Sequence, residues 1–226
     1  PLMIVLEYCK YGSLEHVLQK KKRLTSLSAK LQVACDVARG MERLVSQKIL
    51  HRDLAARNVL LGTNLIAKVA DFGLSRDMTE TNRGGKVYYV SRGLSDIAVQ
   101  WTSPEALFDK RFSEQSDAWS YGMLLQEIFT DGERPYGNNT SVEEVIRAIL
   151  NGRHVSQAPS CPASIYALQL ECWNFAPHQR PSFNTIVGQC IREISVEPLP
   201  HVNVSVPQPL IPDEESYADS NSFGGG

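Results

Sequence analysis

The sequence lacks the features that define several common classes of protein. It has only five cysteines among 226 residues, an odd number, and no C-x-x-C pair. A disulfide framework is therefore not expected, and buried, reduced thiols in a reducing compartment fit better. No apolar run approaches the roughly 20 residues that a membrane-spanning helix needs. The opening stretch, PLMIVLEY, has no basic leader and is not a secretory signal.

An excess of charge of either sign is also lacking. The formal net charge is -2, with 42% hydrophobic and 21% charged residues, which is ordinary for a soluble globular protein. This balance favours neither a nucleic-acid partner nor a membrane surface. The basic run KKKR at residues 20–23 is interpreted as the solvated end of a helix, well placed for the helix dipole, rather than as a docking patch.

Apolar periodicity predicts a mainly helical protein. Residues 2–8 form a short apolar run that predicts a buried strand. Because Pro1 opens directly onto this run, we expect the sequence to be a fragment of a longer protein. Ser13 can cap a first helix. Residues 67–70 are predicted to form a short strand before Asp71. Helical spacing of apolar residues predicts further helices over residues 27–45, 117–129, 141–150, 165–173 and 183–194.

The composition changes after Glu197. Several prolines, then acidic residues, then a Gly-rich end make up the last part of the chain. Segments of this composition cannot bury enough apolar surface to fold. We therefore expect one globular domain over residues 1–197 and a disordered tail over residues 198–226.

Two motifs carry the chemistry, HRDLAARN at residues 51–58 and DFG at residues 71–73. Asp53 can accept the proton of a substrate hydroxyl. The Asn58 amide and the Asp71 carboxylate offer oxygen ligands for Mg²⁺ ions that bridge ATP phosphates. The alternative is a turn rich in Asp and Asn that satisfies only its own backbone. HRDxxxxN followed at short distance by DFG favours the phosphoryl-transfer centre.

This order of motifs resembles the protein kinase family over residues 1–197. The resemblance implies an α+β, protein kinase-like fold, with a mainly helical C-terminal lobe plus the hinge and last strand of the N-terminal lobe. SPE resembles the APE of the family, which implies a buried ion pair between Glu105 and Arg180. Asp117 in SDAWSYG would hydrogen-bond the backbone of the catalytic loop. The resemblance also implies structural roles for His51, Arg52, Phe72 and Gly73.

Finer features resemble the tyrosine kinase branch. The serine/threonine branch usually places a Lys two residues after the catalytic Asp, whereas this chain has Ala55 there and Arg57 before Asn58. LAARN resembles the receptor tyrosine kinase version, which implies that Arg57 joins Asp53 and Asn58 as a catalytic residue and reaches the transferred phosphate. Trp101 in VQWTSPE matches the segment that seats the longer tyrosine side chain.

The segment EYCKYGSL, residues 7–14, is similar to the hinge of receptor tyrosine kinases of the platelet-derived growth factor and stem-cell factor receptor type. The resemblance implies that backbone groups of Glu7 and Cys9 bind the adenine of ATP. Leu6 would be the gatekeeper behind the pocket and Leu60 its apolar floor. ATP and Mg²⁺ are the implied cofactors, with Asn58 and Asp71 as the metal ligands.

Three tyrosines are candidate phosphorylation sites. Tyr88 and Tyr89 lie between DFG and SPE, where paired tyrosines resemble autophosphorylation sites, and a phosphate there would add charge for Arg52 to bind. Their alternative is a pair of exposed surface tyrosines. Tyr217 in DEESYADS would become a docking site for phosphotyrosine-reading domains. Protein substrates with tyrosine are the other expected partners, and no nucleic acid is expected.

Some features depart from the family pattern. Ala98 replaces the usual Pro before Val99, and Gln100 replaces a usual basic residue, which changes the substrate-seating segment. The Gly-rich phosphate loop, the strand Lys and its helix Glu are also lacking, and we expect them upstream of Pro1. Without them the chain cannot clamp ATP phosphates, so the fragment alone is predicted to be inactive and poorly soluble.

Three functions follow, in order of preference. The first is a tyrosine kinase; the alternatives are a pseudokinase that serves as a binding scaffold, and a serine/threonine kinase. The hinge and LAARN resemble receptors, which implies the cytoplasmic portion of a plasma-membrane receptor, with a cytoplasmic kinase as the open alternative. Any membrane contact would be made through a segment outside this chain.

Overall fold

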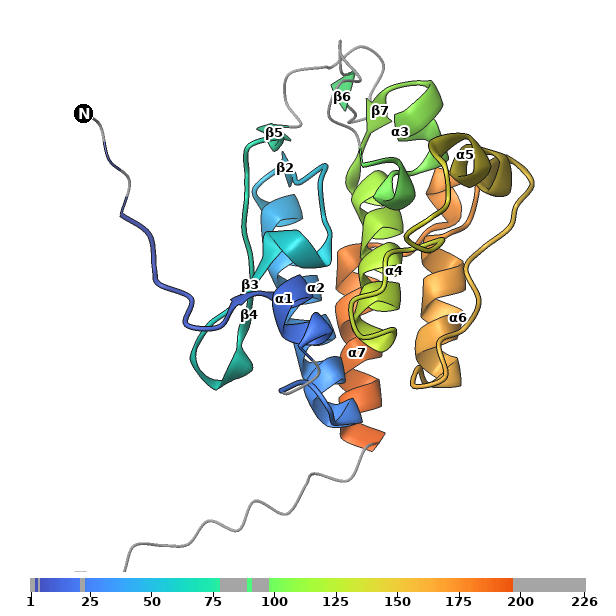
Figure 1. The fold of residues 1–226 in the computed structure, drawn as a ribbon. Helices are drawn as coiled ribbons and strands as arrows, with labels where there is room; N and C mark the ends of the chain where they lie inside the picture. The colour runs from blue at the N-terminus through green and yellow to red at the C-terminus, as the bar shows by residue number, and fades with distance from the viewer. Residues whose placement is uncertain (1–2, 4, 21–22, 78–88, 91–97, 197–226) are drawn as a thin grey trace, which may run out of the picture.

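The computed structural model describes residues 3, 5–20, 23–77, 89–90 and 98–196 (Figure 1). They form a mainly helical body with short antiparallel strands along one side. None of the described helices is long and apolar enough to cross a membrane. The helices are α1 (Leu14–Gln19), α2 (Leu27–Ser46), α3 (Pro104–Phe108), α4 (Glu114–Phe129), α5 (Val142–Leu150), α6 (Ala163–Cys172) and α7 (Phe183–Val196).

The described strands are short and pair locally. A three-stranded antiparallel sheet has the order β1-β3-β4, with Leu60 of its central strand opposite Ser13 and Lys68. Two further antiparallel pairs, β2 with β5 and β6 with β7, flank the segment that carries the sequence motifs. The strands are β1 (Gly12–Ser13), β2 (Ile49–Leu50), β3 (Val59–Leu61), β4 (Ala67–Val69), β5 (Arg76–Asp77), β6 (Tyr89–Val90) and β7 (Arg111–Phe112).

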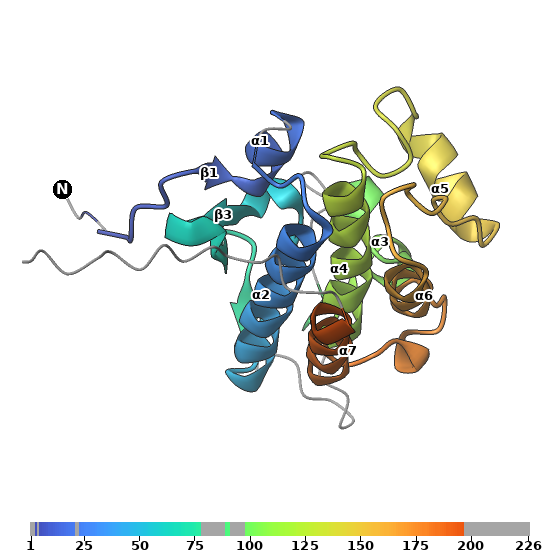
Figure 2. The ribbon, with the colours of Figure 1, turned by 90° about the horizontal axis from the view of Figure 1, so that it is seen from below.

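Helix α4 is the centre of the body. Every residue from Ser116 to Phe129 is buried, and such a helix needs neighbours on all sides. Figure 2 shows α2, α7, α6 and α3 around it. At Gly122 the packing leaves no room for a side chain, because an added Cβ would lie 2.6 Å from Trp173 Nε1. The helix therefore provides a rigid, buried platform for the segments that cross it.

Helices α2 and α7 pack antiparallel beside α4. The Tyr121 hydroxyl of α4 lies 3.0 Å from the Ala34 carbonyl of α2 and 3.3 Å from Cys190 Sγ of α7. Nearer the other end, Asn184 donates to Glu42 (3.0 Å). The end of α7 therefore lies beside the start of α2, as Figure 1 also shows.

The structure supports the predicted state of the thiols. All five cysteines are free, and all except Cys9 are buried. Burial raises the pKa of the Cys190 thiol to about 11, so it stays protonated at neutral pH.

The predicted helices are confirmed, with small shifts at their ends. Ser13 caps α1, its hydroxyl accepting from the His16 N–H. Helix α4 begins three residues before the predicted start because Ser113 and Ser116 form a reciprocal cap there. The predicted short strand at residues 67–70 is β4.

The predicted buried strand at residues 2–8 is wrong for the described residues of this segment. Residues 3 and 5–9 have no regular secondary structure, and Met3, Val5 and Tyr8 are each more than four-fifths exposed. The physical reason is pairing, because strand pairing between this part of the chain and the described sheet involves only Gly12 and Ser13. The tail expected at 198–226 lies outside the described residues.

Candidate active site

The loop of the HRD motif is anchored on helix α4. Both carboxylate oxygens of Asp117 accept backbone hydrogen bonds, from the His51 N–H and the Arg52 N–H, each at 2.9 Å. Arg52 has the left-handed φ of 71°, which is unfavourable for a non-glycine residue and is held here by those bonds. Burial raises the pKa of Asp117, against the opposing effect of His51 and of the two backbone donors.

Asp53 lies at the end of this loop, fixed by two neighbours. Asn58 Nδ2 donates to both the carbonyl and the Oδ2 of Asp53, each at 2.7 Å, and Arg57 forms an ion pair with Oδ1. The Asp53 side chain is 20% exposed, so solvent or a bound hydroxyl can reach it. The loop thus presents one carboxylate in a defined orientation toward the outside.

His51 connects this loop to the DFG segment. Its Nδ1 accepts from the Asp53 N–H (3.3 Å), so the neutral ring carries its proton on Nε2, which lies 3.0 Å from the Ala70 carbonyl. The ring also contacts Phe72, with 5.7 Å between ring centres. Arg52 adds a bond to the Leu74 carbonyl (3.1 Å). These contacts hold the HRD and DFG segments side by side.

Asp71 and Asn58 are suited to a magnesium ion. The Ala70 N–H donates to the Asn58 carbonyl (2.9 Å), which brings the residue before Asp71 against Asn58. The Asp71 side chain is exposed, and Gly73 donates its N–H to Asp71 Oδ1 (3.2 Å). The Asn58 amide uses its nitrogen on Asp53, which leaves its oxygen for a ligand.

No group of three or more His, Cys, Asp or Glu residues that could hold a metal occurs in the described ranges. The two oxygen ligands that Asn58 and Asp71 offer are consistent with Mg²⁺, because this ion commonly binds one or two carboxylates together with substrate phosphates.

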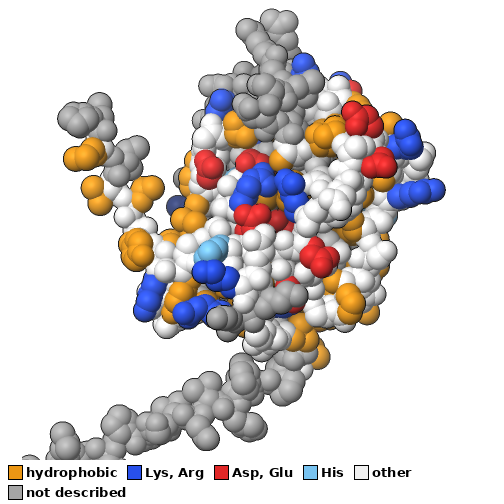
Figure 3. Space-filling model, viewed as in Figure 1, with side chains coloured by type: hydrophobic (Ala, Val, Ile, Leu, Met, Phe, Trp, Pro, Cys, Tyr) orange, Lys and Arg blue, Asp and Glu red, His pale blue; other side chains and the backbone are white. Residues whose placement is uncertain are grey.

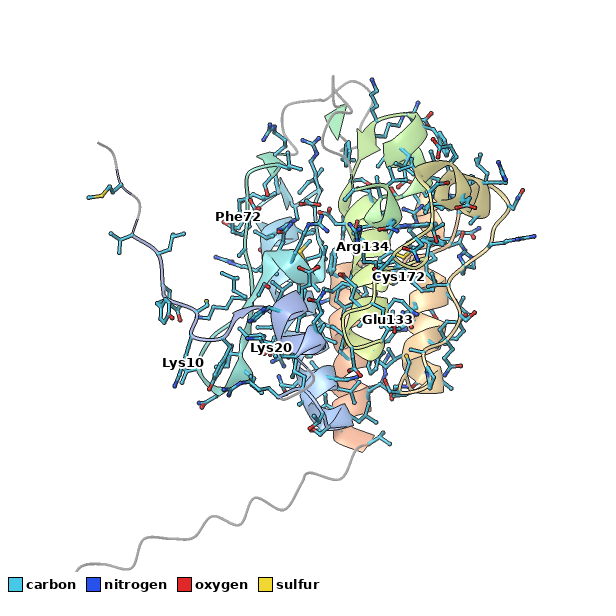
Figure 4. All side chains as sticks on the ribbon, in the orientation of Figure 1. Lys10, Lys20, Phe72, Glu133, Arg134 and Cys172 are labelled. Atoms are coloured by element: carbon cyan, nitrogen blue, oxygen red, sulfur yellow. The ribbon has the colours of Figure 1, made fainter. Side chains whose placement is uncertain are left out.

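A surface hollow of about 550 Å³ opens in front of Asp53. Arg57 stacks over Trp101, with 4.8 Å from its Cζ to the ring centre, and Arg134 approaches the same ring at 5.6 Å. Figure 4 labels Arg134, and Figure 3 shows basic and acidic side chains side by side near the middle of this face. The hollow is further lined by Glu15, Ala98, Val99, Gln100, Asn138, Thr140, Val142 and Val145.

Glu127 is a residue of this site that the sequence motifs did not reveal. Its Oε2 accepts from the Ala56 N–H of the catalytic loop (2.9 Å) and from Trp101 Nε1 (2.8 Å). One buried oxygen therefore joins the loop to the segment that borders the hollow. Burial raises the pKa of Glu127 to about 7, against those two hydrogen bonds and nearby Arg57. The available signal was an acidic residue inside the apolar run MLLQEIF, since buried charges are almost always partnered.

The SPE segment is fastened by the expected ion pair. Arg180 donates from Nη1 to Glu105 Oε1 (2.7 Å) and from Nη2 to Glu105 Oε2 (2.9 Å). The Arg180 side chain is fully buried and also donates to the carbonyls of Asn174 (2.8 Å) and Gln115 (2.9 Å). This bidentate pair ties α3 to the segment before α7.

The residues expected around the adenine lie on an exposed segment and on the sheet beside it. Leu6 is 81% exposed, and no described strand pairs with its segment. The Glu7 carboxylate forms an exposed ion pair with Lys68, and Cys9 is partly exposed. Leu60 is half-buried in the central strand β3.

The candidate phosphorylation sites are largely outside the described residues. Tyr88 and Tyr217 lie outside them altogether. For Tyr89 the structure describes the backbone, which pairs with Phe112 in the β6–β7 ladder.

A helical body that presents Asp53, Asn58 and Asp71 on one side of a buried central helix has the architecture of the C-terminal lobe of a protein kinase. A family model described as protein tyrosine and serine/threonine kinase matches residues 1–190. The chain belongs to this family.

Curated relatives agree with this assignment. The human tyrosine-protein kinase Srms is 43% identical over 82% of this chain, and the rat megakaryocyte-associated tyrosine-protein kinase is 43% identical over 85%. Fibroblast growth factor receptor 1 of Xenopus laevis is 35% identical over 98%. The chain spans 37%, 39% and 29% of the lengths of these relatives, respectively.

Proposed function

We propose that the protein transfers the γ-phosphoryl group of ATP to tyrosine hydroxyls of protein substrates. The observation that carries the proposal is Asp53, an oriented and partly exposed carboxylate beside Arg57 at the edge of a hollow bordered by Trp101. Phosphoryl transfer depends on positioning and charge stabilisation more than on covalent chemistry, and this arrangement supplies both.

Each residue of the loop has a separate task in this mechanism. Asp53 accepts the proton of the substrate hydroxyl, and Asn58 holds its carboxylate in place. Arg57, which stacks on Trp101, binds the transferred phosphate. Asn58 and Asp71 would hold Mg²⁺, which neutralises phosphate charge when bound. His51 and Phe72 keep the two segments in register.

The nucleotide would be bound at the edge of this lobe. We assign the backbone of Glu7 and Cys9 to the adenine, with Leu6 behind it and Leu60 beneath it. The 226 residues contain no G-x-G-x-x-G sequence, so a phosphate clamp has to be supplied by residues outside them. Such a clamp would cover the exposed segment before Gly12, which has an ion pair from Glu7 to Lys68 but no described strand beside it.

Tyrosine rather than serine specificity is supported by Ala55, Arg57 and Trp101, and by the names of two relatives. We further propose a receptor-type kinase that acts on the cytoplasmic side of a membrane, supported by the hinge sequence and by the likeness to a growth factor receptor. Tyr88 and Tyr89 would then be autophosphorylation sites, and phosphorylated Tyr217 a docking site for partner proteins.

The test is a kinase assay on a chain that includes upstream sequence with a phosphate loop, followed by phospho-amino-acid analysis. Native protein should yield phosphotyrosine, and Asp53→Asn should lose about 10²- to 10⁴-fold in rate, the usual contribution of a general base. Asp109→Asn, an exposed acid at the end of α3, is the matched control and should keep full activity. Phosphoserine as the product would favour the serine/threonine alternative, and an inactive native protein would favour a pseudokinase scaffold.

A further inference from the structure

A second hollow, of about 500 Å³, lies beside helix α1 and away from Asp53. Four of its lining side chains can be cationic, namely Lys10, His16, Lys20 and Arg23. They come from the segment before β1, from α1 and from the loop after it, so the fold gathers them into one place. Figure 4 shows Lys10 and Lys20 on the same side of the molecule. We call this hollow the basic pocket.

The cations of the basic pocket are not neutralised locally. Among the described residues no acidic side chain lines it, and Lys10, Lys20 and Arg23 form no ion pair with a carboxylate of the described chain. Lys10 and Arg23 instead lie against the ring of Tyr11, at 5.8 and 4.5 Å from its centre. Tyr11 therefore spaces two positive charges that would otherwise repel each other. Such an arrangement favours an anionic ligand that enters between the charges.

The shape of the basic pocket favours a peptide over a membrane. A surface helix that enters a bilayer does so through exposed apolar side chains, whereas cations without such side chains bind anionic lipid by charge alone. The apolar lining here is Tyr11, which is half-buried under its cations, and Val17, which is buried. Carboxylates on a flexible chain can enter a hollow of this kind and pair with several cations at once.

The chain itself contains a matching acidic segment. Residues 213–219, DEESYAD, place acidic residues on both sides of Tyr217. This segment follows the end of helix α7, and the end of α7 lies beside the start of α2. Because Arg23 precedes α2 by only a few residues, the end of α7 at Val196 and the basic pocket lie toward the same end of α2.

The linker between α7 and the acidic segment is long enough. Residues 197–212 are rich in proline, and an extended Pro-rich chain of this length spans about 50 Å. A globular domain of this size has a radius of gyration of about 16 Å. The acidic segment can therefore reach the basic pocket from Val196.

We propose that the basic pocket binds the acidic segment 213–219 of the same chain. The ligand class is an acidic peptide, and Lys10, His16, Lys20 and Arg23 pair with its carboxylates. If Tyr217 is phosphorylated, which rests on the proposed kinase function, the added charge of about -1.5 to -2 strengthens the contact. Phosphorylation of Tyr217 would hold the docked segment beside α1, and a competing acidic partner would release it.

The experiment measures binding of a fluorescent peptide of residues 211–222 to the whole chain by anisotropy. In the protein used, the tail carries Asp213→Asn, Glu214→Gln, Glu215→Gln and Asp219→Asn, so that its own segment does not compete. The peptide should bind, and the affinity should fall as salt rises, because screening is strong beyond about 10 Å at 0.1 M salt. Synthetic peptide phosphorylated at Tyr217 should bind more tightly, a result that needs no kinase activity.

Matched variants distinguish an effect of the cations in the basic pocket from an effect of the net charge of the protein. Lys10→Gln with Lys20→Gln should weaken binding at least about tenfold, since two charge contacts are lost. Arg43→Gln with Arg153→Gln removes the same charge from exposed sites on α2 and after α5, and should leave binding within about twofold. Circular dichroism checks that both variants fold, as expected for exposed side chains. Equal losses in the two variants, or no binding at all, would overturn the proposal.

The native tail provides the test of intramolecular binding. A tethered segment has an effective concentration on the order of 1 mM, so it should compete with added peptide and weaken its apparent affinity severalfold relative to the neutralised tail. Equal affinity for the two proteins would overturn binding in cis. The last measurement tests binding to vesicles of anionic lipid. If the protein bound the vesicles but not the peptide, and Lys10→Gln with Lys20→Gln abolished vesicle binding, the basic pocket would be a membrane-binding site instead.

Discussion

The catalytic loop and the segment before β1 are built in opposite ways. The loop at residues 51–58 is bonded to buried groups of helix α4, chiefly Asp117 and Glu127. The segment at residues 3–9 has no described strand beside it, and its Leu6 side chain is 81% exposed. Both belong to the same family match, yet only the loop has all its structural partners within the described chain.

The difference shows where each part of the site obtains its order. A loop whose polar groups are satisfied from a buried helix is rigid in the isolated lobe, because breaking it exposes costly unsatisfied groups. An apolar segment becomes ordered only when another surface covers it. The loop that carries Asp53 is therefore preorganised, whereas the segment that we propose binds the nucleotide has no described strand to cover it.

The largest expected effect on stability comes from loss of the ion pair between Glu105 and Arg180. Glu105→Ala should destabilise the protein by about 3–5 kcal/mol, because it leaves the fully buried guanidinium of Arg180 without its counter-charge. Urea denaturation measures the loss. Asp109→Asn, an acid at the end of the same helix that pairs only in an exposed position, should change stability by less than about 1 kcal/mol. A loss below 1 kcal/mol for Glu105→Ala would contradict a structural role for the pair.

The anchor of the catalytic loop should give the next largest effect. Asp117→Ala leaves the N–H groups of His51 and Arg52 without an acceptor and should cost about 2–4 kcal/mol, reduced by relief of the buried charge. Asp117→Asn keeps one acceptor oxygen and should cost less. Hydrogen exchange of the two amides provides a local measurement, and unchanged protection in Asp117→Ala would show that the loop does not depend on this helix.

Glu127 should make part of the stability depend on pH. Its pKa is raised to about 7 from an ordinary value of 4.5, so the folded state keeps a proton that the unfolded chain has lost between those pH values. The stabilising contribution is thus complete below pH 4.5, declines as pH rises, and is lost above about pH 7.

A comparison with Glu127→Gln isolates this contribution, because Gln retains an acceptor oxygen and does not titrate. Native stability measured relative to this variant should fall by about 1–3 kcal/mol between pH 4.5 and pH 8. Glu133→Gln makes the same change of charge at an exposed position and should show no such trend. If the difference in stability between the native protein and Glu127→Gln did not change with pH, the Glu127 carboxylate would be ionised over the whole range.

The smallest effect is expected in the segment before β1. Leu6→Ala should change the stability of this chain by less than about 0.5 kcal/mol, because the side chain already contacts mainly solvent. Leu14→Ala, the same change at a fully buried position in α1, should cost about 2–5 kcal/mol. If Leu6→Ala were as costly as Leu14→Ala, the two regions would not differ in the way described above.

The success of the sequence predictions also differs between the helical body and the segment before β1. Helices α2, α5, α6 and α7 could be predicted closely because their apolar periodicity and their caps are local properties. The strand at residues 2–8 could not, because an apolar run shows that a segment can be buried and not what buries it. Glu127 escaped notice because its partners, Ala56 and Trp101, are far from it along the chain.

The sequence by itself determined the family and the position of the helices, because motif order and apolar periodicity are properties of the chain read in order. It also led to the proposed roles of Asp53, Asn58 and Asp71, which lie in the motifs. Only the tertiary structure decided which polar groups meet. Asp117 and Glu127 hold the loop from a buried helix, and Lys10, His16, Lys20 and Arg23 share one hollow. The physical reason is that hydrogen bonds and charges act over a few ångströms of space, whatever their separation in sequence.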